Sequence, residues 1–208
     1  MRVFLAGASG VIGTHLLPLL KFAGHDVAGM TRTEAHAARL EELGAVPVVC
    51  DVYDLAAVTD AMVSFEPDLV LHELTDLPDD PAQLDEFRQR HARIRIEGTR
   101  NLIRAARAAG ARRFLAQSVA WPMAPGLGRD AVDSLERSVL EIGGVVLRYG
   151  QFYGPDTFHT QAQPTPPRVR VDRAAEATVA ALREPTGILV ITDDGTTRLD
   201  APAGGKED

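Results

Sequence analysis

A glycine-rich turn near the start of the chain carries the clearest chemical signal. The segment GASGVIG, residues 7–13, follows an apolar run and has the spacing G-x-x-G-x-x-G. Small residues let the backbone approach a pyrophosphate, and the positive end of the following helix stabilises the negative charge. The alternative is a turn that keeps this shape without a ligand. The residues that we predict to bind a nucleotide here are Gly7, Ser9, Gly10, Val11, Ile12 and Gly13.

An arginine ends the second apolar run of the chain. The run reads Gly29-Met30-Thr31-Arg32, and an NAD-preferring site usually has a carboxylate at this place to hold the ribose hydroxyls. A guanidinium instead matches the geometry and charge of a 2′-phosphate. We therefore predict that the cofactor is NADP, with NAD as the alternative. An exposed arginine that contacts no ligand is the other interpretation of Arg32.

Polar residues also follow the third and fourth apolar runs. Asp51 could accept the adenine amino group, with the backbone of Val52 completing the pocket, or it could cap a helix, for which Asp54 is the better candidate. His72 ends the fourth run, and ligands of open α/β sheets bind at the carboxyl ends of the strands. His72 could line the cofactor pocket or be a buried histidine with satisfied hydrogen bonds, and both interpretations stay open.

The elements that must position these residues alternate along the chain. Near-continuous apolar runs are typical of parallel strands covered on both faces, and we expect strands at 3–6, 27–30, 46–50, 69–71, 114–116, 145–147 and 188–191. Amphipathic patterns predict helices at 11–23, 34–43, 55–65, 83–109, 130–142 and 173–183. Repeated β-α-β units predict an α/β fold with a doubly wound, mostly parallel sheet. We place residues 1–195 in this single domain.

Three features interrupt the pattern. Pro18 falls inside the first predicted helix and should kink it or shift its hydrogen bonding. The segment 155–170 holds three closely spaced prolines near its end and little periodicity, so we predict a loop. Residues 196–208 are predicted to be a flexible tail.

The amino-acid composition limits the classes of binding partner that we expect for this protein. The chain has 208 residues, of which 45% are hydrophobic and 25% charged, and its net charge is −7. An acidic surface argues against nucleic acid or an anionic membrane as the main partner. No segment reaches the roughly 18 apolar residues that a membrane span needs. We expect a cytoplasmic protein with a small-molecule substrate, and we single out no metal ligands.

Several segments together resemble the extended short-chain dehydrogenase/reductase family, in particular its NAD(P)-dependent epimerase/dehydratase group. They are GASGVIG, DVYD at 51–54, DLVLHELTDLP, EGTRNLIRAARAAGARRFLAQS, LRYGQFYGP, RVRVDRAAEATVAAL and GILVITDDG. The resemblance implies a Rossmann fold with strand order 3-2-1-4-5-6-7 and a nicotinamide cofactor across its carboxyl edge. It also implies that His72 and Glu73 line the cofactor, and it makes Ser118, Tyr149 and Tyr153 the catalytic candidates.

The sequence departs from the family pattern where the family handles protons. The usual Tyr-x-x-x-Lys pair is absent, because the only lysines are Lys21 and Lys206 and the matching positions are Gly128 and Val132. In such a pair the lysine lowers the tyrosine pKa, and the tyrosine acts as acid or base at the substrate oxygen. The chain is also short after Gly154, where the family inserts its substrate lobe. We therefore expect that lobe to be largely deleted.

The sequence leaves three functions open, and it does not decide whether the chain is an enzyme. The first is an NADP-dependent oxidoreductase or epimerase acting on a small carbonyl or sugar-like metabolite. The second is a redox-neutral cyclase, isomerase or dehydratase that uses the old cofactor cleft. The third is a non-catalytic NADP-binding module.

The resemblance also suggests a homodimer. In related proteins the helices matching 83–109 and 130–142 form a four-helix interface between subunits. A stripe that faces the protein's own core is the alternative. The apolar positions that would serve such an interface are Ile94, Leu102, Ile103, Val132, Leu135 and Val139.

Overall fold

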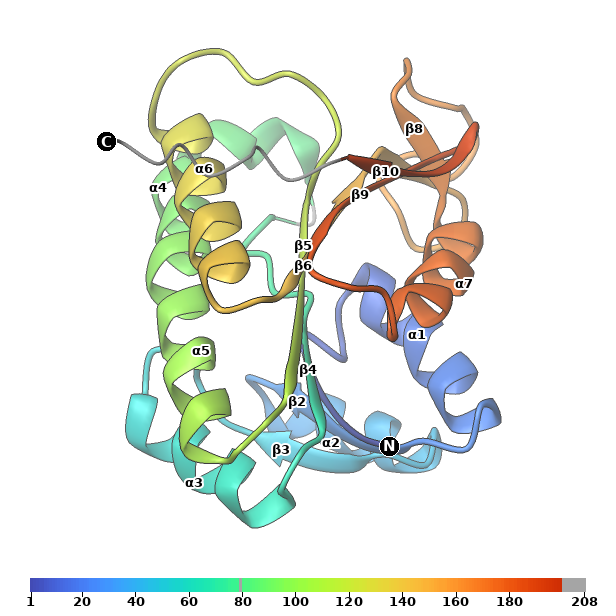
Figure 1. Ribbon diagram of the computed structural model, residues 1–208. Helices are drawn as coiled ribbons and strands as arrows, with labels where there is room; N and C mark the ends of the chain where they lie inside the picture. Colours follow the sequence, from blue (N-terminus) through green and yellow to red (C-terminus); the bar gives the residue numbers. More distant parts are fainter. Residues whose placement is uncertain (79, 200–208) are drawn as a thin grey trace, which may run out of the picture.

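A central sheet of eight strands organises the protein, with helices on both of its faces (Figure 1). The computed structural model describes residues 1–78 and 80–199. The strand order is β3-β2-β1-β4-β5-β6-β9-β10, and every neighbouring pair is parallel except β9 with β10. Since β9 is the seventh predicted strand, the predicted order and the Rossmann-type α/β fold are confirmed. The strands are β1 (Arg2–Ala6), β2 (Asp26–Thr31), β3 (Val46–Val49), β4 (Leu69–His72), β5 (Arg113–Val119), β6 (Val145–Tyr149), β9 (Gly187–Thr192) and β10 (Gly195–Leu199).

The helices divide between the two faces of the sheet. Those that pack on one face are α1 (Val11–Phe22), α2 (Glu34–Glu42) and α7 (Val171–Ala181). Those on the other face are α3 (Leu55–Phe65), α5 (Thr99–Ala108) and α6 (Leu127–Glu141). A π-helical segment, η2 (Ile94–Gly98), joins α4 (Leu84–Arg93) to α5, and a 3-10 turn, η1 (Pro81–Gln83), precedes α4. The single helix predicted for 83–109 is therefore a continuous helical segment of 3-10, α and π turns, which we call the rod (Pro81–Ala108).

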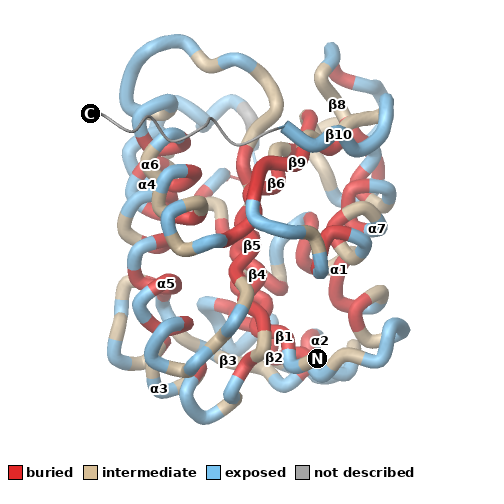
Figure 2. The backbone as a smooth tube through the Cα atoms, viewed as in Figure 1, coloured by how far each residue is buried: buried red, intermediate tan, exposed pale blue. Residues whose placement is uncertain are grey.

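Two apolar layers hold the helices to the sheet. Successive strand residues point to opposite faces, so Val3 and Leu5 pack toward α1 and α7, whereas Phe4 and Ala6 pack toward α3 and α5. Figure 2 shows the central strands buried along most of their length. Because both faces are covered, the strands need apolar residues at consecutive positions, which explains the near-continuous runs in the sequence.

Some boundaries differ from the sequence prediction. Helix α1 continues through Pro18 without interruption, with the proline on its exposed side. The segment predicted as a loop ends in β8 (Arg168–Arg170), which pairs with β7 (Gln151–Tyr153) in a separate two-stranded sheet. Three-residue strands are too short to give a recognisable period, so the sequence could not reveal them.

The end of the sheet also extends past the predicted domain boundary. We expected the tail to begin at Thr196, but β10 pairs antiparallel with β9 and covers Gly195–Leu199. The two strands are joined by Asp193 and Asp194 followed by Gly195, which has φ +112°. Residues 200–208 of the predicted tail lie outside the described residues.

The six apolar positions considered for a dimer interface belong to the core of the single chain. All of them are buried by the chain itself: Ile94, Leu102, Ile103, Val132, Leu135 and Val139. They face the sheet because α5 and α6 each carry one apolar stripe, and that stripe is used for packing within the protomer. The homodimer stays a prediction, and it would need other residues. In the part of the chain that the structure describes, no helix has the length and apolarity to cross a membrane.

Alanine substitutions at two glycines within helices test how closely α1 packs against the turn that precedes it. A Cβ atom at Gly13 would lie 2.2 Å from the carbonyl oxygen of Gly7, a backbone atom that cannot move aside. We expect Gly13→Ala to lower the free energy of unfolding by about 1–3 kcal/mol, measured by urea denaturation.

The matched control is Gly128→Ala in α6. A Cβ atom there meets the flexible end of Met123. Alanine also favours helix, so this variant should be unchanged or up to about 1 kcal/mol more stable. Equal effects of the two substitutions would contradict the close packing of α1 on its turn.

Candidate functional site

The candidate site lies where the central strands end at one edge of the sheet. Ala6 at the end of β1 pairs with Met30 of β2 on one side and with His72 of β4 on the other. His72 in turn pairs with Ala116 of β5. The predicted cofactor residues that follow these strands, among them Gly7 and Glu73, are therefore brought to the same edge.

The glycine turn is shaped by close backbone contacts. Gly7 has φ +93°, and a Cβ atom there would lie 2.7 Å from the carbonyl oxygen of Glu73. Gly10 differs, since its φ of −81° suits any residue and its Cβ would meet only the Gly7 oxygen at 3.3 Å. Gly10 is exposed, so the side chain that it lacks would project outward over the start of α1. The fold needs glycine at Gly7 and Gly13 more than at Gly10.

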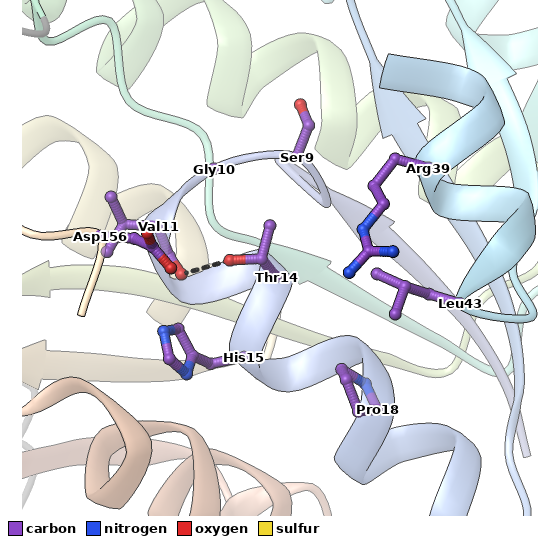
Figure 3. Close-up of a pocket in the computed structure, with 9 residues that line it drawn as sticks. All are labelled: Ser9, Gly10, Val11, Thr14, His15, Pro18, Arg39, Leu43 and Asp156. Atoms are coloured by element: carbon purple, nitrogen blue, oxygen red, sulfur yellow. Dashed lines mark hydrogen bonds between the residues drawn. The ribbon is translucent and has the colours of Figure 1, made fainter.

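The start of α1 fits an anion. The helix has no side-chain cap and no acidic residue in its first turn, so its first N–H groups point out of the helix unneutralised. A cleft of about 480 Å³ runs along this turn and is lined by Ser9, Gly10 and His15 among others. Figure 3 shows Asp156 and Arg39 on opposite sides of the opening turn. A diphosphate could approach these amides because Gly10 adds no side chain.

Arg32, the candidate for a 2′-phosphate, lies beside the turn. Its side chain is 50% exposed, and its Nη1 is 3.5 Å from the carboxylate of Asp76. Asp76 is buried and is held more closely by Arg90, with two contacts of 3.1 Å. Ser9 and Thr31 share a hydrogen bond of 3.0 Å between the turn and the end of β2. Arg32 is thus loosely held and accessible from the edge.

The residues proposed for the adenine side adopt a tight turn after β3. The Asp51 carboxylate accepts a hydrogen bond from the backbone N–H of Tyr53, and Asp54 caps α3 by accepting from the N–H of Ala57. The carbonyl of Val52 accepts from the side-chain amide of Asn101. Asp51 is not the helix cap, and its side chain stays exposed.

His72 is buried and fully hydrogen-bonded. Its Nδ1 accepts from the backbone N–H of Leu74 at 3.3 Å, so Nε2 carries the proton and lies 2.8 Å from the Thr99 hydroxyl. Burial, with a further contribution from the charge of Arg95, lowers the pKa of His72 to about 3. Of the two interpretations of His72, the structure supports the satisfied buried histidine, and such a neutral ring is not a general base.

The three catalytic candidates are not brought together. The Ser118 hydroxyl donates to Glu136 of α6 at 2.5 Å. Tyr149 is buried on the opposite face of the sheet, where its hydroxyl donates to Glu73 and shares a 2.7 Å hydrogen bond with Thr178 of α7. Tyr153 lies farther along the chain, and its hydroxyl bonds to Asp193. Each polar group is engaged in a separate structural contact.

The electrostatics of the two tyrosines also oppose proton transfer near neutral pH. Burial, followed by the charge of Glu73, raises the pKa of Tyr149 well above 10. Desolvation and Asp193 raise the pKa of Tyr153 as well. On α6, the position matching the family lysine is Val132, which is buried and apolar. None of the three catalytic candidates therefore replaces the missing proton-transfer pair.

Comparison with known proteins identifies the family. Residues 3–123 match the model of the NAD dependent epimerase/dehydratase family. The chain belongs to the NAD dependent epimerase/dehydratase family. It is 38% identical to a Streptomyces protein named 3-diazoavenalumate denitrifying reductase, over 239 aligned positions that cover 93% of this chain and 76% of that protein.

Solved structures of epimerases share the fold of this family member. UDP-glucose 4-epimerase from Thermus thermophilus, in complex with NAD, matches with a TM-score of 0.77 at 20% identity. The UDP-glucose 4-epimerase of Thermotoga maritima, solved with UDP-glucose, matches with a TM-score of 0.76 at 17% identity. Each match covers 95% of this chain but 79% of the epimerase. The shorter length agrees with the expected loss of the substrate lobe.

Sequence reasoning missed the roles of three polar groups of this epimerase/dehydratase family member, of which Glu136 and Arg95 are buried and His91 is partly buried. Glu136 forms an ion pair with Arg148 across α6 and β6, in addition to its bond from Ser118. Arg95 and His91 lie on the rod next to β4. Their spacing of four residues, continued by Thr99, was the available signal, but the apolar neighbours Ile94 and Ile96 obscured it. No cluster of metal ligands occurs among residues 1–78 and 80–199.

Glu73 makes stability depend on pH. Its side chain is buried, one carboxyl oxygen has no partner among the described residues, and desolvation raises its pKa to about 8. Between about pH 4.5 and 8 the folded chain holds a proton that the unfolded chain has released, so stability falls as pH rises through this window. We expect Glu73→Gln to raise the Tm at pH 8.5 by several degrees and to leave it unchanged near pH 4.5.

Thermal melts of both proteins from pH 4.5 to 9 measure this difference. His72 and His91, whose pKa values are lowered to about 3, act in the opposite direction below pH 6.5. They contribute equally to both proteins and cancel in the difference. Glu141→Gln on the exposed surface of α6 is the control and should match the wild type throughout. A pH-independent gain in Glu73→Gln would contradict the assignment.

Proposed function

We propose that this protein is a nicotinamide-dependent reductase that replaces the diazo group of an aromatic substrate with hydrogen and releases N₂. The observation that carries the proposal is a contrast at one edge of the sheet. The phosphate-binding turn is intact there, whereas Ser118, Tyr149 and Tyr153 are each engaged in a separate structural contact. A reaction that uses hydride and needs no acid or base from these residues suits this edge.

The chain's own residues explain how the cofactor would be held. The amides at the start of α1, left open by Gly10, bind the diphosphate, and Asp51 and Val52 form the adenine side. Arg32 is placed to pair with a 2′-phosphate, which favours NADPH over NADH. When bound, the reduced nicotinamide supplies a hydride to the substrate.

An aryl diazonium ion suits a site of this kind. Its ring carbon accepts a hydride, the C–N bond breaks, and both bonding electrons leave with N₂, so that R–N₂⁺ and H⁻ give R–H and N₂. The hydride step itself involves no proton; where an ortho hydroxyl of the substrate is ionised, the phenolate product takes its proton from water. Ketone reduction and epimerisation of a sugar hydroxyl both require proton transfer at oxygen, a task for which none of Ser118, Tyr149 and Tyr153 is free. An aliphatic diazo carbon would first need a proton.

The relative from Streptomyces supports this choice. Its name states that it reduces a diazo compound with loss of nitrogen, and the match spans most of both chains. The proposed reaction is an oxidoreduction, which is the reaction type of the first of the three functions left open by the sequence. The substrate differs, because an aryl diazonium ion that needs no acid takes the place of the small carbonyl or sugar-like metabolite.

Isotope transfer tests the proposed reaction. With NADPH deuterated at C4 and 3-diazonio-4-hydroxycinnamate, we expect deuterium at the ring carbon of the product, and none when the reaction runs in D₂O with ordinary NADPH. Heat-denatured protein measures the uncatalysed rate. Tight NADPH binding without turnover would instead indicate a non-catalytic module, and deuterium taken from D₂O would contradict hydride transfer.

Two substitutions test the binding of the cofactor. Gly10→Val should keep the fold, because its φ is unstrained, but should weaken NADPH binding by tenfold or more since its side chain covers the first amides of α1. Arg32→Gln should weaken NADPH binding and leave NADH binding unchanged. Fluorescence titration measures the affinities, and thermal melts check folding. Unchanged NADPH affinity in Gly10→Val would contradict the phosphate site.

A further inference from the structure

Three polar residues form one stripe on the rod that faces the end of β4. His91, Arg95 and Thr99 are spaced by four residues, and the π-helical segment η2 contains the middle one. Segments of this type add one residue to a helix and occur often at functional sites. Arg95 is 8% exposed and Thr99 is buried, so the stripe points into the protein at the candidate site.

The outer residues of the stripe have hydrogen-bond partners, whereas the middle one has none among the residues that the structure describes. His91 accepts a hydrogen bond from the backbone N–H of Asp76, and Thr99 bonds to His72. Arg95 forms no hydrogen bond or ion pair within residues 1–78 and 80–199, although its guanidinium carries five N–H donors. A charged group this far buried is ordinarily paired, and none of the Arg95 nitrogens is among the fully buried atoms that lack a partner.

The nearby acid does not neutralise Arg95. Glu136 on α6 is near enough for its charge to act on Arg95, but its two oxygens already accept from Ser118 and Arg148. Burial lowers the pKa of Arg95 to about 10, so it stays charged at neutral pH. The same charge helps to keep His91 and His72 neutral, with pKa values of about 3. Arg95 is thus a cation without a direct partner among residues 1–78 and 80–199, with the neutral rings of His72 and His91 and the charge of Glu136 nearby.

We propose that Arg95 is the receptor for a carboxylate of the substrate. A planar guanidinium binds a carboxylate through two parallel hydrogen bonds, and the low dielectric of a buried site strengthens them. The place also suits a substrate, since the Arg95 charge acts on His72, which ends β4 at the cofactor edge. Glu136, whose charge acts on Arg95, accepts from Ser118 near the end of β5. Resting on the proposed function, this inference narrows the substrate to aryl diazonium compounds that also carry a carboxylate.

Helix α6 gives a second reason to expect a cation at this place. Val132, where the family has its lysine, stands one helical turn before Glu136, and α6 packs against η2. Arg95 on the neighbouring rod thus supplies a positive charge that α6 lacks, because α6 has Val132 in place of the family's lysine. Arg95 binds and positions in this view, and it transfers no proton.

Ligand selectivity tests the proposal without requiring turnover. We expect 4-hydroxycinnamate to bind the wild-type protein in calorimetry and to raise its Tm, whereas the neutral amide of the same compound binds at least tenfold more weakly. In Arg95→Met the carboxylate should lose at least tenfold in affinity and the preference over the amide should vanish. The control, Arg100→Met, changes an exposed arginine on the same rod and should behave as the wild type.

Stability and cofactor binding provide independent readouts. Arg95→Met removes an unpaired buried charge, so its Tm without ligand should rise above that of the wild type. Its NADPH affinity should be unchanged. A fall in NADPH affinity with no loss of carboxylate selectivity would overturn the proposal and assign Arg95 to the cofactor.

Equal binding of carboxylate and amide by the wild type would also overturn the proposal, and this measurement needs no variant. The diazonium assay separates the two hypotheses. Selective carboxylate binding without diazonium reduction supports the role of Arg95 and contradicts the proposed reaction. Reduction that proceeds equally on a substrate without a carboxylate supports the reaction and contradicts the role of Arg95.

Discussion

The close approach of the glycine turn to the end of β4 is the contact on which the arrangement of the site depends. Gly7 lies so near the carbonyl of Glu73 that no side chain fits between them, and Gly13 lies closer still to the carbonyl of Gly7. These two contacts fix the start of α1 at the sheet edge, with its amides pointing outward. They also carry Glu73 beneath the turn, where its carboxyl is buried and holds a proton. The anion-binding surface and the buried acid are consequences of the same packing.

The polar side chains at this edge are mostly committed to one another. His72 is tied to Thr99, Ser118 to Glu136, and Tyr149 to Glu73, so each candidate for proton chemistry is used in holding two elements together. In the usual pattern of the family, a tyrosine and a lysine on one helix perform that chemistry. Here the same helix is anchored by an ion pair to β6 instead. The result is an edge whose polar groups are paired and where Arg95 has no partner among the described residues, an arrangement suited to binding and orientation.

Much of the fold was accessible from sequence, because its strands are apolar runs and its helices have clear stripes. The phosphate turn was equally clear, since Gly7 and Gly13 are required sterically. The individual roles of Tyr149 and Ser118 could not be predicted, because a side chain's face and partner depend on pairing between distant strands. Arg95 was hidden for a different reason: a π-helical turn breaks the 3.6-residue period from which a buried face is recognised. The edge strand β10 was missed because its exposed residues lack an apolar pattern.

The π-helical turn has a consequence for how this chain can change by insertion and deletion. Residues after Gly98 are rotated by about 100° relative to a regular helix, because one extra residue occupies the turn. Leu102 and Ala105 face the sheet only in that rotated frame. Loss of a single codon in η2 would turn the buried stripe of α5 toward solvent, so the segment that presents Arg95 is also locked in length by the core beyond it.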